Sequence, residues 1–225
     1  MASRFWLVDQ GTPPISPAFD AGWEQTGQAD RKRLLLKRKS ESIVALANST
    51  NITVPITTTQ DILCRQFISD PFVSVSLVGT VSLVIRCSES ATTANVTLAA
   101  VLKIVDQFGN TPRTLFSTFN TDTEFAAAGS DATRIVNAQA ITTTTLLAGD
   151  RLVLELGGHA AGPTAATTYL MRFGNAATSD FALTSALTTD LNPWLELSAD
   201  LHTDDFSNTQ SVRAADGISV TERTR

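Results

Sequence analysis

Apolar and polar residues alternate along much of the chain, and a period of two predicts β-strands. In FVSVSLVGTVSLVIRCSE, at 72–89, large apolar residues alternate with small polar ones, and Gly79 interrupts the pattern. We expect a long half-buried strand there, with a bend or bulge at the glycine. Similar runs, separated by turn residues, predict about eight to ten strands along the chain.

Turn signals between these runs set the limits of individual strands. AGDRLVLELG, at 148–157, combines a Gly-Asp turn with leucines on one face of a strand and Val153 and Glu155 on the other. DQFGNTP, at 106–112, has the Gly, Asn and Pro of a hairpin turn. A helix of one or two turns is expected only in short crossings such as TTTQDILCRQF, at 57–67. Without βαβ alternation, a doubly wound enzyme fold is not expected.

These patterns predict an all-β protein, an antiparallel β-sandwich of the jelly-roll type spanning residues 31–203. Residues 1–30 contain three prolines and no sustained period, which predicts an extended N-terminal arm. Its aromatic residues are expected to pack on a protein body, either its own or a neighbour's: Phe5, Trp6, Phe19 and Trp23. The polar residues 204–225 are expected to form a C-terminal tail without periodic structure.

Composition indicates a foldable chain with a weakly charged surface. The hydrophobic fraction is 43%, the charged fraction is 17% and the formal net charge is −5. An acidic chain argues against general nucleic-acid binding. Cys64 and Cys87 lie in apolar runs and are interpreted as buried thiols. The sequence shows neither an apolar stretch of membrane-spanning length nor a secretory signal pattern, so we expect no membrane partner and no secretion.

A basic block, RKRLLLKRK, stands out at 31–39. It lacks interleaved aromatic residues for base stacking, so nucleic acid is not the expected partner. One interpretation is a solvated edge strand whose charges prevent aggregation. The other is a surface that docks on an acidic neighbour through six charges: Arg31, Lys32, Arg33, Lys37, Arg38 and Lys39.

Candidate catalytic chemistry is sparse. The two histidines, His159 and His202, are not accompanied by a nucleophile elbow, and no phosphate-binding glycine loop is present. Glu155 and Glu196 are interpreted as solvent-facing strand carboxylates. The sequence therefore predicts no enzyme, no cofactor and no metal site. An alternative binding chemistry uses aromatic side chains for carbohydrate, with Trp194 and Tyr169 as candidates.

Four blocks resemble the β-rich virion structural proteins of tailed bacteriophages and their prophage relatives. They are SPAFDAGWEQT, ITTTQDILCRQFISDP, TVSLVIRCSESATTANVTL and DFALTSALTTDLNPWLELSADL. The resemblance implies a structural role in the particle, as a capsid decoration or cement protein, a neck or tail adaptor, or a tail-fibre module.

The expected function is that of a non-enzymatic capsid cement or decoration protein, assembled in the host cytoplasm and located in the virion. Its expected partners are the major capsid protein or other virion proteins, and further copies of itself in a trimer or dimer. The alternative is a tail or fibre jelly-roll module that binds a carbohydrate or receptor of the host surface.

Overall fold

The structure, a computed structural model, describes residues 2–8, 11–26, 32–36, 50–56, 60–119, 121, 123–127, 131–161, 167–174, 179–185, 187–189 and 191–203. Across these ranges the chain forms strands and one short 3-10 turn, η1 (Thr92–Ala94). The strands are β1 (Ser3–Leu7), β2 (Lys32–Leu36), β3 (Thr50–Ile56), β4 (Gln60–Ser69), β5 (Val75–Leu77), β6 (Thr80–Glu89), β7 (Val96–Val105), β8 (Arg113–Thr118), β9 (Ala126–Ala127), β10 (Ala132–Ala140), β11 (Thr144–Leu146), β12 (Arg151–Ala160), β13 (Thr167–Phe173) and β14 (Trp194–Leu197).

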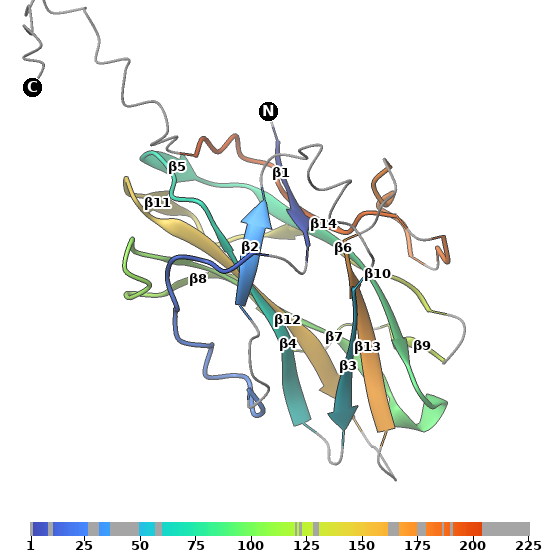
Figure 1. Cartoon of the computed structure of the whole chain (residues 1–225). Coiled ribbons are helices and arrows are strands. Elements are labelled where there is room, and N and C mark those ends of the chain that lie inside the picture. Colours follow the sequence, from blue (N-terminus) through green and yellow to red (C-terminus); the bar gives the residue numbers. More distant parts are fainter. Residues whose placement is uncertain are drawn as a thin grey trace, which may run out of the picture.

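Twelve of the described strands belong to one curled sheet (Figure 1). Its main path runs β3-β13-β6-β14-β1-β2-β4-β12-β7-β8, and β9 and β10 pair with β6. The pairs β2–β4 and β6–β9 are parallel, so the sheet is mixed. The all-β prediction is confirmed, whereas the jelly roll is not confirmed, because the strands follow one continuous hydrogen-bonded path.

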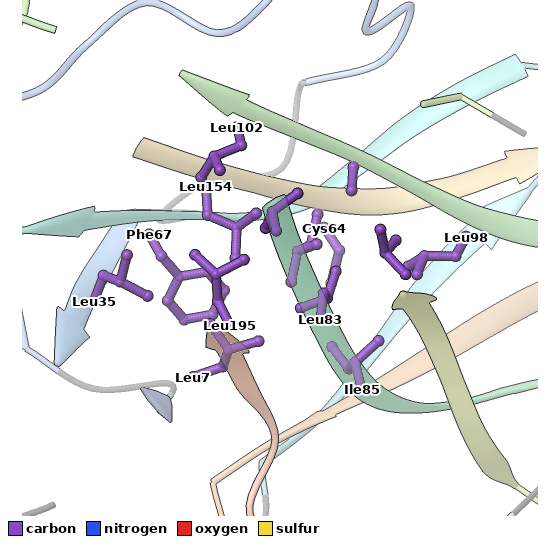
Figure 2. Close-up of a cluster of buried hydrophobic side chains, with 14 of the residues drawn as sticks. Leu7, Leu35, Cys64, Phe67, Leu83, Ile85, Leu98, Leu102, Leu154 and Leu195 are labelled. Carbon is purple, nitrogen blue, oxygen red and sulfur yellow. The ribbon is translucent and has the colours of Figure 1, made fainter. Parts of the chain in front are cut away.

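The main core lies inside the curl of this sheet. Figure 2 shows Leu7, Phe67, Leu83, Leu154 and Leu195 pointing toward one another from five different strands. On β12 the leucines predicted to share a face all belong to this core. The alternating positions therefore identify the inner face of this strand correctly.

The outer face of the sheet is also covered, by two segments without regular structure. Residues 15–25, which we call the N-terminal covering segment, lie over β4, β12 and β7, where Trp23 packs on Leu63 and Val101 and Ile15 packs on Val153. Phe181, Leu187 and Leu191 cover the neighbouring part of the sheet, where Phe181 packs with Trp194 and Val84. Several strands are thus buried on both faces, which is unusual for an antiparallel sheet.

The predicted helical crossing at 57–67 is wrong for its described residues, which belong to β4. Ile62, Leu63 and Cys64 are consecutive and buried. Such a run does not alternate because both faces of β4 are covered, so its periodicity resembles that of a helix turn. The predicted break at Gly79 is confirmed: this residue has φ of +130° and separates β5 from β6.

The basic block contributes an interior strand, not an edge strand. Leu35 and Leu36 of β2 pair with β1, and the other side of β2 pairs with β4 in parallel. The edge-strand interpretation is therefore wrong. Of the six basic residues, Lys32 and Arg33 are described, while Arg31, Lys37, Arg38 and Lys39 lie outside the described residues.

The N-terminal segment also enters the sheet. β1 lies between β14 and β2, and Phe5 pairs with Leu195 in the register of β1 with β14. The segment that was expected to be an arm thus supplies a central strand of the same sheet. The predicted tail, residues 204–225, lies outside the described residues.

Both cysteines are buried, and they form no disulfide, which confirms the prediction for Cys64 and Cys87. Burial raises the pKa of the Cys87 thiol well above its ordinary value. Within the described ranges, no helix has the length and apolar character required to cross a bilayer.

We expect substitution of Gly157 by alanine to destabilise the fold strongly. Gly157 follows a register shift between β12 and β4, and a Cβ atom there would lie 2.1 Å from the Ile62 carbonyl oxygen. The obstacle is backbone, so Gly157→Ala should cost about 3 kcal/mol of unfolding free energy, at the upper end for overpacking. Urea unfolding measures this.

The neighbouring Gly158→Ala is the matched comparison. Its Cβ would meet side-chain atoms, Cγ1 of Val96 at 2.7 Å and the Tyr169 ring at 3.2 Å. Side chains move more easily than a strand backbone, so we expect a loss of about 1 kcal/mol. Equal losses for the two variants would contradict the assigned cause.

Candidate functional site

A cleft of about 700 Å³ lies between the N-terminal covering segment and the turn that joins β7 to β8. Two lysines from different strands line it, Lys32 of β2 and Lys103 of β7. We call it the lysine cleft; its other lining residues include Ser16, Phe19, Phe108 and Thr114.

Glu155 is a buried carboxylate next to the lysine cleft. Its side chain is fully buried on β12, and its Oε1 lies 2.7 Å from Nζ of Lys103. Nε2 of Gln66 donates to Oε1 at 2.8 Å, and the indole of Trp23 donates to Oε2 at 2.6 Å. The backbone N–H of Asp20 donates to Oε2 at 3.0 Å. Four donors surround one carboxylate, which is how a buried charge is made tolerable.

The carboxylate and its lysine also fix the N-terminal covering segment. Lys103 Nζ donates to the Ala18 carbonyl at 2.9 Å. Together with the Asp20 and Trp23 contacts, this bond fastens the segment to β7 and β12. The Glu155 prediction is therefore wrong: the residue lies on the outer face, as expected, but a distant segment covers it and no part of its side chain is exposed.

Lys32 supplies a second positive charge, closer to solvent. Its Nζ donates to the Pro17 carbonyl at 2.9 Å and to the Ser16 hydroxyl, and it lies 5.0 Å from the centroid of the Phe19 ring. Within the described part of the chain, no carboxylate forms an ion pair with it. Desolvation lowers the pKa of Lys32, nearby Glu155 opposes this shift, and Lys103 adds to it. The cleft therefore holds a cation whose described hydrogen-bond partners are neutral oxygens.

Phe108 stands at the mouth of the cleft, at the tip of the predicted hairpin turn. Its side chain is 71% exposed. The turn itself is held by Asp106, whose Oδ1 accepts the N–H groups of Phe108 and Asn110, both at 2.9 Å. The turn thus presents an aromatic ring to solvent at a cleft that also contains the Lys32 ammonium. This arrangement can bind an anionic group together with an apolar surface.

The structure places the predicted N-terminal contact residues on the chain's own body. Phe5 is fully buried in the main core and Trp23 is buried against Leu63. Trp6 and Phe19 are half-buried; the Trp6 indole donates to Asp180 Oδ1 at 3.0 Å. Phe5 and Trp23 are therefore not available to a neighbour, and of the four only Phe19 lies in the lysine cleft.

The candidate carbohydrate residues are buried as well. Trp194 is 2% exposed, its indole donates to the Phe181 carbonyl at 2.7 Å, and Arg4 covers its ring. Tyr169 has no exposed surface, and its hydroxyl donates to the Ile62 carbonyl at 2.7 Å. The prediction of an exposed sugar-binding platform at Trp194 and Tyr169 is wrong, because Phe181 and its neighbours cover Trp194 on the outer face and Tyr169 lies in the main core.

Other candidate chemistry lies apart from the cleft. His159 Nδ1 is 2.8 Å from Asp61 Oδ1, and exposed His202 is 3.8 Å from Asp200. Glu196 forms an ion pair with Arg4 on β1, far along the sheet path from Glu155. Among the described residues, no group of three acidic, histidine or cysteine side chains is arranged to hold a metal ion.

Sequence reasoning missed Lys103, Gln66 and Phe108. Lys103 carried a usable signal, since it is a charged residue inside the apolar run AAVLKIV, at 99–105. A buried lysine needs a partner of opposite charge, and Glu155 in LVLEL, at 152–156, presents the same anomaly. The two anomalies together predict a buried ion pair.

Comparison with known proteins gives likenesses of fold only. No family model and no curated protein sequence matches the chain. A CocE/NonD family hydrolase from Staphylococcus aureus is similar in structure at 11% identity and a TM-score of 0.49; the match covers 88% of this chain and 36% of the hydrolase. The chain therefore spans about a third of that protein's length.

Structures from infectious bursal disease virus are also similar, more distantly. The Gx strain structure matches at 12% identity and a TM-score of 0.25, covering 81% of this chain and 43% of that one. The VP2 subviral particle matches at 13% identity and a TM-score of 0.21, covering 77% and 45%. At these TM-scores, neither likeness transfers a function to this chain.

The likeness to a hydrolase overturns the prediction that the chain is no enzyme, and that prediction is withdrawn. Enzyme folds of this β-rich kind exist, so the lack of a recognisable motif was not a sufficient reason to exclude catalysis. The likeness itself supplies neither a reaction nor a catalytic residue.

We expect Glu155→Gln to destabilise the protein by about 3 kcal/mol, because it leaves the Lys103 ammonium buried without its counter-charge. Urea unfolding measures the loss, and limited proteolysis should cut residues 15–25 sooner than in the wild type.

Glu196→Gln is the control. It removes a partly exposed ion pair with Arg4, so its cost should stay below about 1 kcal/mol. If both variants lose equal stability, burial of Glu155 is not what makes its ion pair important.

Proposed function

We propose that the chain is a structural protein of a virus particle, a capsid cement or decoration protein that binds a neighbouring capsid protein through the lysine cleft. The observation that carries the proposal is the exposed Phe108 ring beside Lys32, which forms no direct ion pair with a carboxylate among the described residues. An aromatic anchor next to a positive charge suits an acidic protein surface with one apolar side chain.

Several other features support this proposal. A charged fraction of 17% leaves a surface rich in Thr, Ser and Ala. The sheet is covered on its outer face by the chain's own segments, which produces a closed, well-packed unit. Such a unit can bind to a lattice without rearrangement, so little conformational entropy is lost on docking. The resemblance to tailed-bacteriophage virion proteins, seen in the sequence, points to the same class of partner.

Assembly of several copies on the particle belongs to the same proposal. A cement protein stabilises a shell by joining neighbouring capsid subunits, and weak contacts become strong when several are made at once. A dimer of this chain would present two lysine clefts to the lattice, and a trimer would present three.

We expect Phe108→Ala to weaken binding to particles that lack the protein by about tenfold, the loss expected for an interface aromatic anchor. Co-sedimentation of purified protein with such particles measures the affinity. Leu183→Ala is the control, because Leu183 is also exposed but does not line the cleft. Equal binding of wild type and Phe108→Ala would sink the proposal.

Salt supplies a second readout of the same contact. Binding through Lys32 to an acidic surface should weaken as ionic strength rises above about 0.15 M, because exposed charges are then screened over shorter distances. Lys32→Gln should bind more weakly at low salt and respond less to added salt. Salt-independent binding would contradict a charged contact.

A further inference from the structure

A pair of carboxyl groups lies at the end of β6, beside the start of β7, whereas the lysine cleft lies near the end of β7. Glu89, the last residue of β6, is 2% exposed. Its Oε2 accepts the N–H of Val96 at 3.0 Å, whereas its Oε1 is buried and accepts no hydrogen bond. One of the two oxygens of this carboxyl group is therefore satisfied and the other is not.

The carboxyl group that interacts with Glu89 is that of Glu124, on a short segment that we call the strap, residues 123–127. Glu124 forms a β-bridge with Thr97, and the N–H of Phe125 donates to the Val96 carbonyl at 2.6 Å. The end of the strap, β9, pairs in parallel with Ser88 and Glu89. The strap thus lies directly across the end of β6 and the start of β7.

Among the described residues, few charged or titratable groups lie near Glu89 and Glu124. Arg134 of β10 donates from Nε to the Glu124 carbonyl at 2.6 Å and from Nη1 to the Thr133 carbonyl at 2.7 Å. On β13, the hydroxyl of Tyr169 is turned away to the Ile62 carbonyl. Cys87 of β6 keeps its proton, because burial raises its pKa. Glu124 and Arg134 are therefore the charged neighbours that act on Glu89.

We propose that the strap is a proton-operated latch, in which protonated Glu89 donates a hydrogen bond to the Glu124 carboxylate and loss of that proton releases the strap. The proposal explains the unsatisfied oxygen. When Glu89 is ionised, Oε1 can only accept a hydrogen bond, and so can the Glu124 carboxylate beside it. When Glu89 is protonated, Oε1 can donate a hydrogen bond to that carboxylate. Only the protonated form satisfies both oxygens of Glu89.

The direction of the pH dependence follows from the environment. Burial raises the pKa of Glu89 to about 7, the Val96 hydrogen bond opposes this, the Glu124 carboxyl raises it further, and Arg134 opposes. A folded-state pKa above the unfolded value means that the stabilisation is full below about pH 4.5 and is lost as pH rises through about 7. The latch is accordingly closed in mildly acidic solution and opens in mildly alkaline solution.

Opening has a specific consequence for the surface. Phe125, at the centre of the strap, is buried with its ring 5.9 Å from that of Tyr169. Release of the strap would expose this apolar side chain and the edge of β6 that β9 covers. A rise in pH would thus create a new surface at one end of the sheet, independently of the lysine cleft.

Hydrogen exchange on the intact chain tests the latch. After correction for intrinsic exchange rates, protection of the Phe125 and Ala127 amides should fall about tenfold between about pH 6 and pH 8, the change expected for one lost proton. Amides of β12 should show no such change. Glu89→Gln should remove the pH dependence, because its amide group donates to Glu124 at both pH values.

Glu196→Gln is the matched control and should keep the wild-type profile. Constant protection of the wild-type strap between these pH values would overturn the proposal, as would wild-type pH dependence in Glu89→Gln. If Glu89→Gln fails to fold, carbon-detected titration of the wild-type Glu89 carboxyl decides: a midpoint near pH 7 supports the latch, and one below about pH 5 refutes it.

Discussion

The buried ion pair between Glu155 and Lys103 is the constraint on which the rest of the fold depends. It lies on the outer face of β12 and β7, where it would face water if residues 15–25 were elsewhere. Once those residues cover it, the pair needs every donor that they bring, including the Asp20 N–H and the Trp23 indole. The ion pair and the covering segment therefore depend on each other. The segment shields the pair from water, and the pair fixes the position of the segment.

This mutual dependence accounts for the lysine cleft. The covering segment is held at Ala18, Asp20 and Trp23, so its first residues, with Ser16 and Pro17, are fixed beside Lys32 of β2. Lys32 then finds two neutral oxygens there, and no described carboxylate, for its ammonium. The position of the Lys32 ammonium, which we assign to partner binding, thus follows from the way in which Glu155 is buried.

Alternation along the sequence predicted the class of fold, the break at Gly79, the β7–β8 turn and the inner face of β12. It failed where a strand is covered on both sides, as at Ile62–Cys64, because burial of both faces erases the period. It also misjudged Glu155, because the pattern of a strand is the same whether its outer face meets water or a segment more than a hundred residues away. Trp194 and Tyr169 were misjudged because alternation does not show what lies against a strand: Phe181 packs on Trp194, and Tyr169 belongs to the main core. In the candidate site, Lys32 and Phe19 could be predicted from the sequence as residues that contact other parts of a protein. That they lie in one cleft with Lys103 and Phe108 could not be predicted.

The position of β1 in the middle of the sheet sets the order in which the sheet can fold. Ser3 pairs with Leu197, so one of the earliest strands to leave the ribosome waits for one of the last before its edge is satisfied. Pairing over such a separation is slow, because the chain loses loop entropy before the contact is gained. Until translation passes β14, the strands on either side of β1 cannot form one sheet, and their apolar edges are open to other chains. Truncation before Trp194 would leave two half-sheets without the strand pair that joins them.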